Sequence, residues 1–173
     1  HTRGPESVRA SIYREGLALT LYDEGKLAEA EANFRVACSG HARNQGSNGL
    51  ARAYCETGLA RLLIDTGRAR AAEPLLRNSL TVVRSKMPAG DRTLARTQSV
   101  LGYSLLALHQ LPEAEAALRA SYPDIVRGFG PQARDSVRAR HWIERLYAEM
   151  GRPSEARRFI DEVAANQGPR NIR

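Results

Sequence analysis

The stretch that decides the fold runs from Leu17 to Ala37 and reads LALTLYDEGKLAEAEANFRVA. On each side of Gly25, apolar and small residues recur at intervals of three and four positions, which is the spacing of an amphipathic helix. Only a couple of residues separate the two segments, and so short a connection makes neighbouring helices antiparallel. The stretch therefore predicts a helical hairpin that turns at Gly25.

This hairpin pattern recurs every 42 residues along the chain. The pair Leu17-Ala18 returns as Leu59-Ala60, Leu101-Gly102 and Ile143-Glu144, and the turn position holds Gly25, Gly67, His109 and Gly151. We therefore expect four repeats in a single domain that spans 1–173, with approximate limits of 4–45, 46–87, 88–129 and 130–171. Because one hairpin cannot bury both faces of its helices, the repeats must stack to build a common core.

The second helix of each repeat is predicted to follow the turn directly, over 27–38, 69–83, 111–126 and 153–165. Pro112 and Pro153 stand at the start of such helices, where a missing backbone N–H costs nothing. The fourth repeat departs from the pattern, because Glu144 stands where the other repeats have a small residue. We expect its hairpin to be splayed, or its register to differ from this alignment.

These columns resemble the tetratricopeptide (TPR) repeat, whose signature is a large–small pair and a turn glycine followed by Ala, an aromatic residue or Leu, and Ala. In the first repeat the signature positions are Leu17-Ala18, Gly25, Ala30, Phe34 and Ala37. The 42-residue period is similar to the kinesin-light-chain type of array. The resemblance implies an all-α, right-handed superhelical solenoid of four antiparallel helix-turn-helix repeats. It also implies a scaffold that binds a protein or peptide, as one module of a larger polypeptide such as a bacterial signalling protein.

Sequence patterns typical of enzymes are missing. The chain contains no GxSxG, GxxxxGK[ST] or GxGxxG motif. The histidines share no spacing typical of metal ligands; they are His1, His41, His109 and His141. We therefore predict a protein that is not an enzyme and that needs no cofactor or metal. His109, in the turn of the third repeat, is interpreted as a helix C-terminal residue that interacts with the helix dipole.

Candidate binding residues lie on the face of the first helices that lines the concave side in the TPR family. They are Tyr54, Arg61, Arg96, Tyr103, Arg138, His141, Trp142 and Arg145. Guanidinium groups make forked bonds to carboxylates and aromatic rings supply contact area at low entropic cost, so this set suits an acidic or C-terminal peptide. Acidic residues near the ends of the same helices make a ligand of mixed charge an alternative; they are Asp23, Asp65 and Glu149. A further alternative is that all these are ordinary solvated residues, with Trp142 shielding the end of the stack.

The sequence also bears on three other binding modes. The carboxylate clamp of chaperone-binding TPR arrays is not expected, because Glu15, Leu19 and Gly58 stand in its Lys and Asn columns. End-to-end self-association is an alternative, since the first and last repeats of a solenoid leave open faces. Nucleic-acid binding is expected to be weak, because the net charge of +7 is not arranged as one continuous stripe.

The compartment is inferred from apolar runs and cysteines. No apolar run approaches the roughly 18–20 residues that cross a bilayer. We expect a cytoplasmic protein, with an extracytoplasmic part of a larger protein as the alternative. Cys38 and Cys55 lie on elements that pack together in this architecture, which would allow a bridge between them. Because free cysteine behaves as a small apolar residue, we predict two buried thiols.

Overall fold

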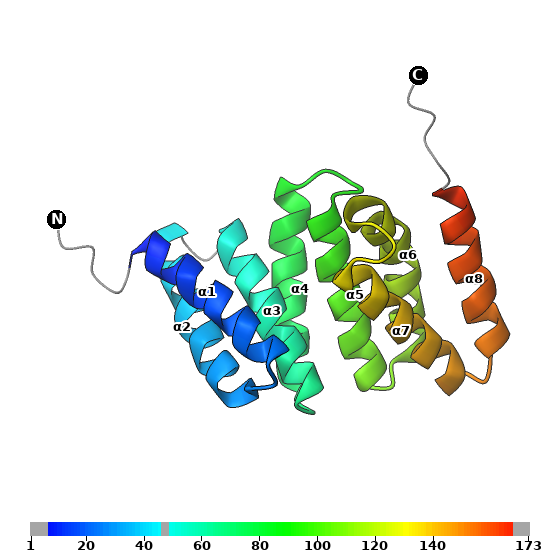
Figure 1. The fold of residues 1–173 in the computed structure, drawn as a ribbon, viewed down its shortest axis with the longest axis horizontal. Coiled ribbons are helices and arrows are strands. Elements are labelled where there is room, and N and C mark those ends of the chain that lie inside the picture. Colours follow the sequence, from blue (N-terminus) through cyan, green and yellow to red (C-terminus); the bar gives the residue numbers. More distant parts are fainter. Residues whose placement is uncertain (1–6, 46–48, 168–173) are drawn as a thin grey trace, which may run out of the picture. The chain divides into compact units, whose positions relative to one another are not determined.

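The computed structural model describes residues 7–45 and 49–167, and over these residues the chain forms eight α-helices joined by short connections (Figure 1). They are α1 Val8–Asp23, α2 Leu27–Gln45, α3 Leu50–Asp65, α4 Ala69–Lys86, α5 Arg92–Ala107, α6 Leu111–Phe129, α7 Arg134–Glu149 and α8 Pro153–Asn166. These described residues contain no strand. The predicted all-α class is confirmed.

The helix starts follow the repeat period. First helices begin 42 residues apart, at Val8, Leu50, Arg92 and Arg134. Second helices keep the same interval and begin at Leu27, Ala69, Leu111 and Pro153. The predicted period and the predicted starts of the second helices are therefore confirmed.

The second helices run past their predicted ends, and α2 does so by the most, since it continues to Gln45. Contacts with α1 hold this extension in place. Ser11 packs so closely against Gly40 that a side chain at position 40 would collide with it. The buried His41 places its Nε2 atom 3.0 Å from a carboxylate oxygen of Glu15. The periodic pattern did not reveal these tertiary contacts.

Each hairpin turns at a residue with a left-handed backbone conformation. The φ angle is +76° at Gly25, +77° at Gly67, +57° at His109 and +70° at Gly151. The amide that follows donates to a carbonyl five residues back, as from Gln110 to Leu105 at 2.9 Å. This bond satisfies a carbonyl that the end of a helix leaves unpaired. His109 therefore stands in for a turn glycine, although a side chain in this conformation costs about 1–2 kcal/mol.

The chain divides into two compact units, His1–Met87 and Pro88–Arg173, here called the N-terminal and C-terminal units. Each unit contains two hairpins, and the boundary between the units coincides with the predicted limit between the second and third repeats. Other predicted limits, at residues 4, 46 and 171, lie outside the described residues. The assignment of 1–173 to a single domain stays a prediction.

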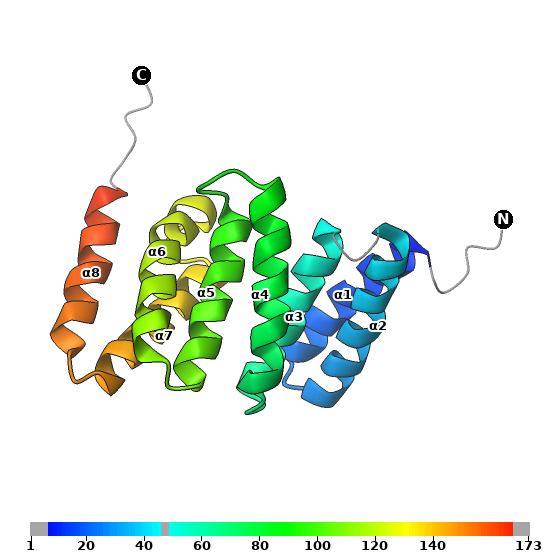
Figure 2. The same cartoon turned by 180° about the vertical axis from the view of Figure 1, so that it is seen from behind.

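In the N-terminal unit, α1 packs on α2, α2 on α3, and α3 on α4 (Figures 1 and 2). The small residues of the repeat columns are fully buried where the helices approach; they are Ala18, Ala30, Ala60 and Ala72. The ring of Phe34, on α2, lies directly against Gly58 of α3, where a Cβ atom would come within 2.8 Å of it. Small residues thus let the backbones approach closely enough to bury one large side chain between them.

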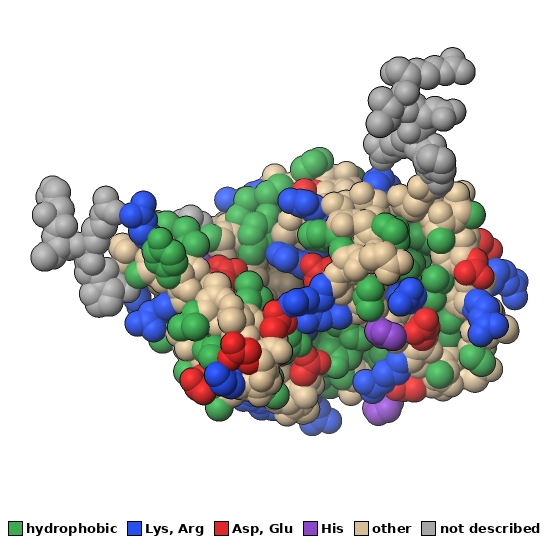
Figure 3. Space-filling view, viewed as in Figure 1, with side chains coloured by type: hydrophobic (Ala, Val, Ile, Leu, Met, Phe, Trp, Pro, Cys, Tyr) green, Lys and Arg blue, Asp and Glu red, His purple; other side chains and the backbone are tan. Residues whose placement is uncertain are grey.

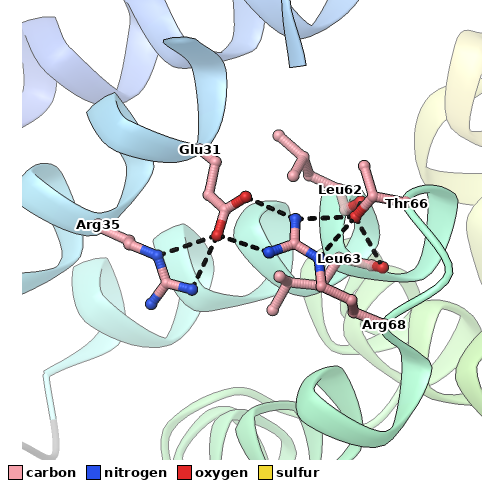
Figure 4. Close-up of polar contacts among 6 residues, drawn as sticks. All are labelled: Glu31, Arg35, Leu62, Leu63, Thr66 and Arg68. Atoms are coloured by element: carbon pink, nitrogen blue, oxygen red, sulfur yellow. Dashed lines mark hydrogen bonds and ion pairs between the residues drawn. The ribbon is translucent and has the colours of Figure 1, made fainter. Parts of the chain in front are cut away.

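An ion pair joins the first repeat to the second. Arg68, just before α4, donates to both carboxylate oxygens of Glu31 on α2, at 3.0 and 2.5 Å (Figure 4). Arg35 donates to the same carboxylate from the next turn of α2. The hydrogen bonds from Arg68, reinforced by Arg35, lower the pKa of the Glu31 carboxyl from its ordinary 4.5 to about 2. Glu31 therefore stays ionised in the folded protein down to strongly acidic pH.

A disulfide bond also joins these two repeats, between Cys38 on α2 and Cys55 on α3. Their Cα atoms are 5.4 Å apart, which lies within the range that a disulfide spans. The prediction of two free thiols is therefore wrong, although both side chains are buried as expected. The packing of α2 on α3 places the two cysteines near enough for their sulfur atoms to bond, which the expectation of two separate apolar side chains did not include.

In the C-terminal unit, α5 packs on α6 and α6 packs on α7. Gly102 of α5 leaves room for the buried side chain of Leu118. The inter-repeat ion pair recurs here, because Arg152 occupies the position of Arg68 and lies 3.4 Å from Glu115 on α6. Tyr147, fully buried on α7, donates from its hydroxyl to the same Glu115 at 2.6 Å.

The fourth hairpin is the most open, because α7 and α8 contact each other far less than the helices of the other pairs. Its register matches the alignment, so of the two expectations for this repeat the structure shows the splayed hairpin. A cavity of about 390 Å³ separates the two helices, lined by Arg140, Glu144, Pro153, Ala156, Arg157, Ile160 and Asp161. The large Glu144 replaces the small residue that lets the other hairpins close. Phe159 of α8 packs instead against Tyr122 of α6, with ring centroids 6.0 Å apart.

Candidate functional site

An aromatic pair lies between the two first helices of the C-terminal unit. Tyr103 on α5 and Trp142 on α7 stack with ring centroids 4.5 Å apart and an interplanar angle of 6°. Both side chains are half-buried, so part of each ring remains at the surface. The expectation that these residues share one surface agrees with this geometry. Stacked rings also fit the alternative in which Trp142 shields the end of the stack, so the assignment of these residues to a binding site stays a prediction.

An arginine pair, Arg96 and Arg138, accompanies the aromatic pair. Arg96 lies two helical turns before Tyr103 on α5, and Arg138 lies one turn before Trp142 on α7, so each helix presents both residue types on one face. The two guanidinium groups flank one carboxylate, with Nη1 of Arg96 4.0 Å and Nη1 of Arg138 3.9 Å from Asp135 oxygens. These distances are longer than the roughly 2.7–3.2 Å of an N–H···O hydrogen bond. The three side chains are partly exposed, which leaves them in reach of a ligand.

The surface beyond the aromatic pair carries charges of both signs. Arg145 donates to Glu149 on α7 at 2.9 Å, and the exposed His109 ring lies 3.5 Å from the same carboxylate. His141 lies 3.1 Å from Glu144 on its own helix. His109 thus contacts a carboxylate in addition to its place at a helix end. This part of the surface therefore carries charges of both signs, and the choice between an acidic ligand and one of mixed charge stays a prediction.

The N-terminal unit contributes two of the predicted binding residues, Tyr54 and Arg61, both on α3. Tyr54 is half-buried. Arg61 is buried, with its guanidinium carbon 4.7 Å from the centre of the Tyr22 ring on α1. The hydroxyl of Tyr22 in turn donates to the carboxylate of Asp65. Arg61 therefore packs α1 against α3, a role that its helical position alone did not indicate.

Sequence reasoning missed Asp135 as a member of this cluster. Asp135 lies in the first turn of α7, where an acidic residue is usually explained by the helix dipole. It lies three residues before Arg138 on the same helix, and this spacing was the available signal. Its contact with Arg96 joins two repeats and has no local signature.

Two broader features bear on the chemistry of the molecule. Among the described residues, no group of three or more His, Cys, Asp or Glu side chains is placed to hold a metal ion. None of the helices in the described ranges is both long enough and apolar enough to cross a membrane.

Comparisons with known proteins reveal the fold. The sequence matches no protein-family model and no curated protein. Two crystal structures of a putative kinesin light chain with nearly identical TPR-like repeats, from Podosopora anserina, are similar to this chain. Both are 20% identical, with TM-scores of 0.73 and 0.74; the matches cover 100% and 98% of this chain and 80% of theirs. BtubC (BKLC) from P. vanneervenii is 16% identical with a TM-score of 0.72, over 95% of this chain and 68% of its own. The chain thus has the fold of a kinesin-light-chain-like TPR array.

Proposed function

We propose that this TPR-like array is a protein-interaction scaffold and that α5 and α7 hold an extended segment of a partner protein. The observation that carries the proposal is the stack of Tyr103 on Trp142 beside two arginines that share Asp135. Stacked helical repeats expose long, continuous surfaces, which is how such folds recognise other chains. The proposal involves no catalytic activity, cofactor or metal.

The aromatic pair would supply most of the apolar contact. Tyr and Trp rings give a large contact area for the loss of only two side-chain torsions, so they are efficient anchors. Because Tyr103 and Trp142 already stack on each other, little of this freedom remains to be lost on binding. An apolar or aromatic side chain of the ligand would pack on their exposed edges.

The arginine pair would recognise a carboxylate. Arg96 meets Asp135 only at 4.0 Å, so its guanidinium keeps the geometry to make forked bonds with an incoming acid. A hydrogen bond to a charged group contributes about 1.5–3 kcal/mol before competition with Asp135 is counted. Glu149 and Glu144 lie farther along α7 and would repel a uniformly acidic segment. We therefore propose a ligand that carries an acidic residue and an apolar residue, followed by basic or polar ones.

The context of the scaffold is also a proposal. A disulfide persists in an oxidising compartment and is rare in the cytosol, so the Cys38–Cys55 bond supports a role outside the cytoplasm. We place the array in a larger polypeptide, such as a signalling protein. Nucleic acid fits less well, because basic and acidic side chains are interspersed on the face seen in Figure 3.

The test uses Trp142, the only tryptophan, as an intrinsic probe. Synthetic peptides of matched length, with and without acidic and aromatic residues, are titrated while the fluorescence of Trp142 is followed. Peptides that carry both residue types should change it saturably, and the double substitution Arg96→Glu with Arg138→Glu should weaken binding at least tenfold. The matched control is Arg77→Glu, an exposed arginine on α4. Equal binding to the wild type and the double variant would remove α5 and α7 as the site.

A further inference from the structure

The first helix of the array leaves open a face that the later repeats cover. Leu17 on α1 is 49% exposed, whereas its counterparts Leu59 on α3 and Ile143 on α7 are 5% and 0% exposed. Tyr13 is 70% exposed, and its counterparts are fully buried: Cys55 and Ala139. The difference has a direct cause, because α2 packs on α3 and α6 packs on α7. We call Tyr13, Gly16, Leu17 and the adjoining Lys26 the open face of α1.

A glycine on this face is uncovered, whereas its counterpart in the next repeat is covered. Gly58 on α3 is covered by the Phe34 ring of α2, so that a Cβ atom at position 58 would lie 2.8 Å from a ring carbon. Gly16 is the counterpart of Gly58, and a Cβ atom there would have no atom of the described residues within 4 Å. The described residues therefore leave the backbone at Gly16 uncovered, whereas the Phe34 ring covers the equivalent backbone at Gly58.

A positive charge on this face also repeats a known contact. Arg68 and Arg152 stand one residue past the turn position of their repeats and bind Glu31 and Glu115 on the preceding second helix. Lys26 stands at the same position in the first repeat. Its side chain is exposed and lies 2.8 Å from the neighbouring Glu24. The cation is thus in place for the pairing that two later repeats make.

We propose that the open face of α1 docks an amphipathic helix of a partner protein, which presents a glutamate to Lys26 and, three residues later, a large apolar side chain to Gly16. Both covering helices of this chain have a glutamate followed three residues later by a large apolar side chain, as Glu31 with Phe34 and Glu115 with Leu118. Of these apolar side chains, Phe34 lies against the counterpart of Gly16, whereas Leu118 packs on Gly102 of its own hairpin. The docked helix would repeat the cation–glutamate pairing that the array makes twice and the ring-on-glycine contact that Phe34 makes with Gly58.

A second copy of this chain does not meet the requirement. Its outermost helix, α8, has Ile160 at the position of Phe34 and Arg157 at the position of Glu31. Stacking of α8 on the open face would therefore place Arg157 opposite Lys26, and these two positive charges would repel each other. The occupant is a helix with the acidic residue, and end-to-end stacking of two copies is an outcome for the test to exclude.

The test joins a copy of residues 27–45, with its cysteine changed to Ala, to the amino end of the full chain. Tethering raises the effective concentration of the helix to the millimolar range, so a weak contact becomes measurable. Hydrogen exchange of the α1 amides should slow at least tenfold relative to the parent chain. Lys26→Glu should remove the protection. Changing the copied equivalent of Glu31 to Lys in that variant should restore it.

Two controls decide between occupants. A copy in which the phenylalanine is replaced by Ala should lose most of the protection, as should Leu17→Glu in the chain itself. Unchanged exchange in the tethered protein would overturn the proposal. Dimerisation of the parent chain would also overturn it, if sedimentation shows that the dimer depends on concentration and is abolished by Leu17→Glu. A second copy of the chain would then be the occupant of the open face of α1.

Discussion

Arg68 donates hydrogen bonds from two guanidinium nitrogens to the carboxylate of Glu31, across the boundary between the first and second repeats. This pairing gives the folded state a proton-linked stability, because the pKa of Glu31 is about 2 in the fold and ordinary in the unfolded chain. The contribution is fully present above the ordinary pKa of 4.5 and is lost as the pH falls toward 2. We expect Glu31→Gln to lower the free energy of unfolding by about 1 kcal/mol at pH 7.

The measurement is urea unfolding of the wild type and of Glu31→Gln at pH 7, 4 and 3. The difference between the two proteins should shrink as the pH falls, since protonation removes the same charge that the substitution removes. Glu29→Gln, on the exposed side of the same helix, is the control and should show a smaller effect. A difference that stays constant down to pH 3 would show that Glu31 acts through packing rather than through its charge.

The disulfide predicts a second effect on stability. Cys38 and Cys55 are separated by 17 residues, and closing a loop of that size stabilises a fold by about 3 kcal/mol in the chain-entropy model. The double substitution Cys38→Ala with Cys55→Ala should lower the free energy of unfolding by about that amount. Reductant should destabilise the wild type and leave the double variant unchanged. Thiol titration of the denatured protein without reductant should find no free thiol, and two free thiols would contradict the bond.

The two equivalent glycines Gly16 and Gly58 should respond in opposite directions to the same substitution. Gly16→Ala should stabilise the protein by about 0.5–1 kcal/mol, because alanine favours a helix interior and meets no neighbour there. Gly58→Ala should destabilise it by about 1–3 kcal/mol, because the new methyl group collides with the Phe34 ring. Thermal and urea unfolding of both variants decide this. Equal effects would show that α2 does not press on α3 as described.

His109 gives a prediction about backbone conformation. Glycine adopts positive φ without strain, so His109→Gly should raise the free energy of unfolding by about 0.5–1 kcal/mol after its greater unfolded-state entropy is counted. His109→Val should lower it, because a branched side chain suits this conformation least. Gly67→Ala, at the same position of the second repeat, makes the reverse change and should lower the free energy of unfolding. Stabilisation by valine would show that the turn is not left-handed.

Much of this fold could be predicted because the signal is repeated four times. Ala30 and its counterparts define one buried column, and Gly25 with its counterparts defines the turn, so a chance match in one repeat carries little weight. The positions of helix starts follow from such columns. The end of α2 does not follow from the columns, because it depends on contacts of Gly40 and His41 with α1.

The candidate surface could be predicted only as far as helical periodicity reaches. Arg96 and Tyr103 share a face because they are seven residues apart, and the structure agrees. Periodicity does not determine the side-chain torsions that place the charged end of a long side chain. Arg61 folds onto Tyr22, and Arg96 reaches Asp135, through torsions that no spacing encodes.

Asp135 provides the last prediction, because it occupies the place that we propose for the carboxylate of a ligand. Its oxygens are 3.9 and 4.0 Å from Arg138 and Arg96, so it neutralises both arginines and competes with an incoming acid. Asp135→Asn removes the charge at nearly constant size. We expect it to raise the affinity for an acidic, aromatic-containing peptide about threefold to tenfold at low salt, and less at high salt, where charges are screened. Stability should fall by about 0.5 kcal/mol, because the first turn of α7 loses a favourable charge. Titration followed by Trp142 fluorescence measures the affinity, and Asp161→Asn on α8 is the control. Weaker binding by Asp135→Asn would mean that Asp135 itself contacts a basic group of the ligand, and the proposed preference for an acidic residue at this position would be wrong.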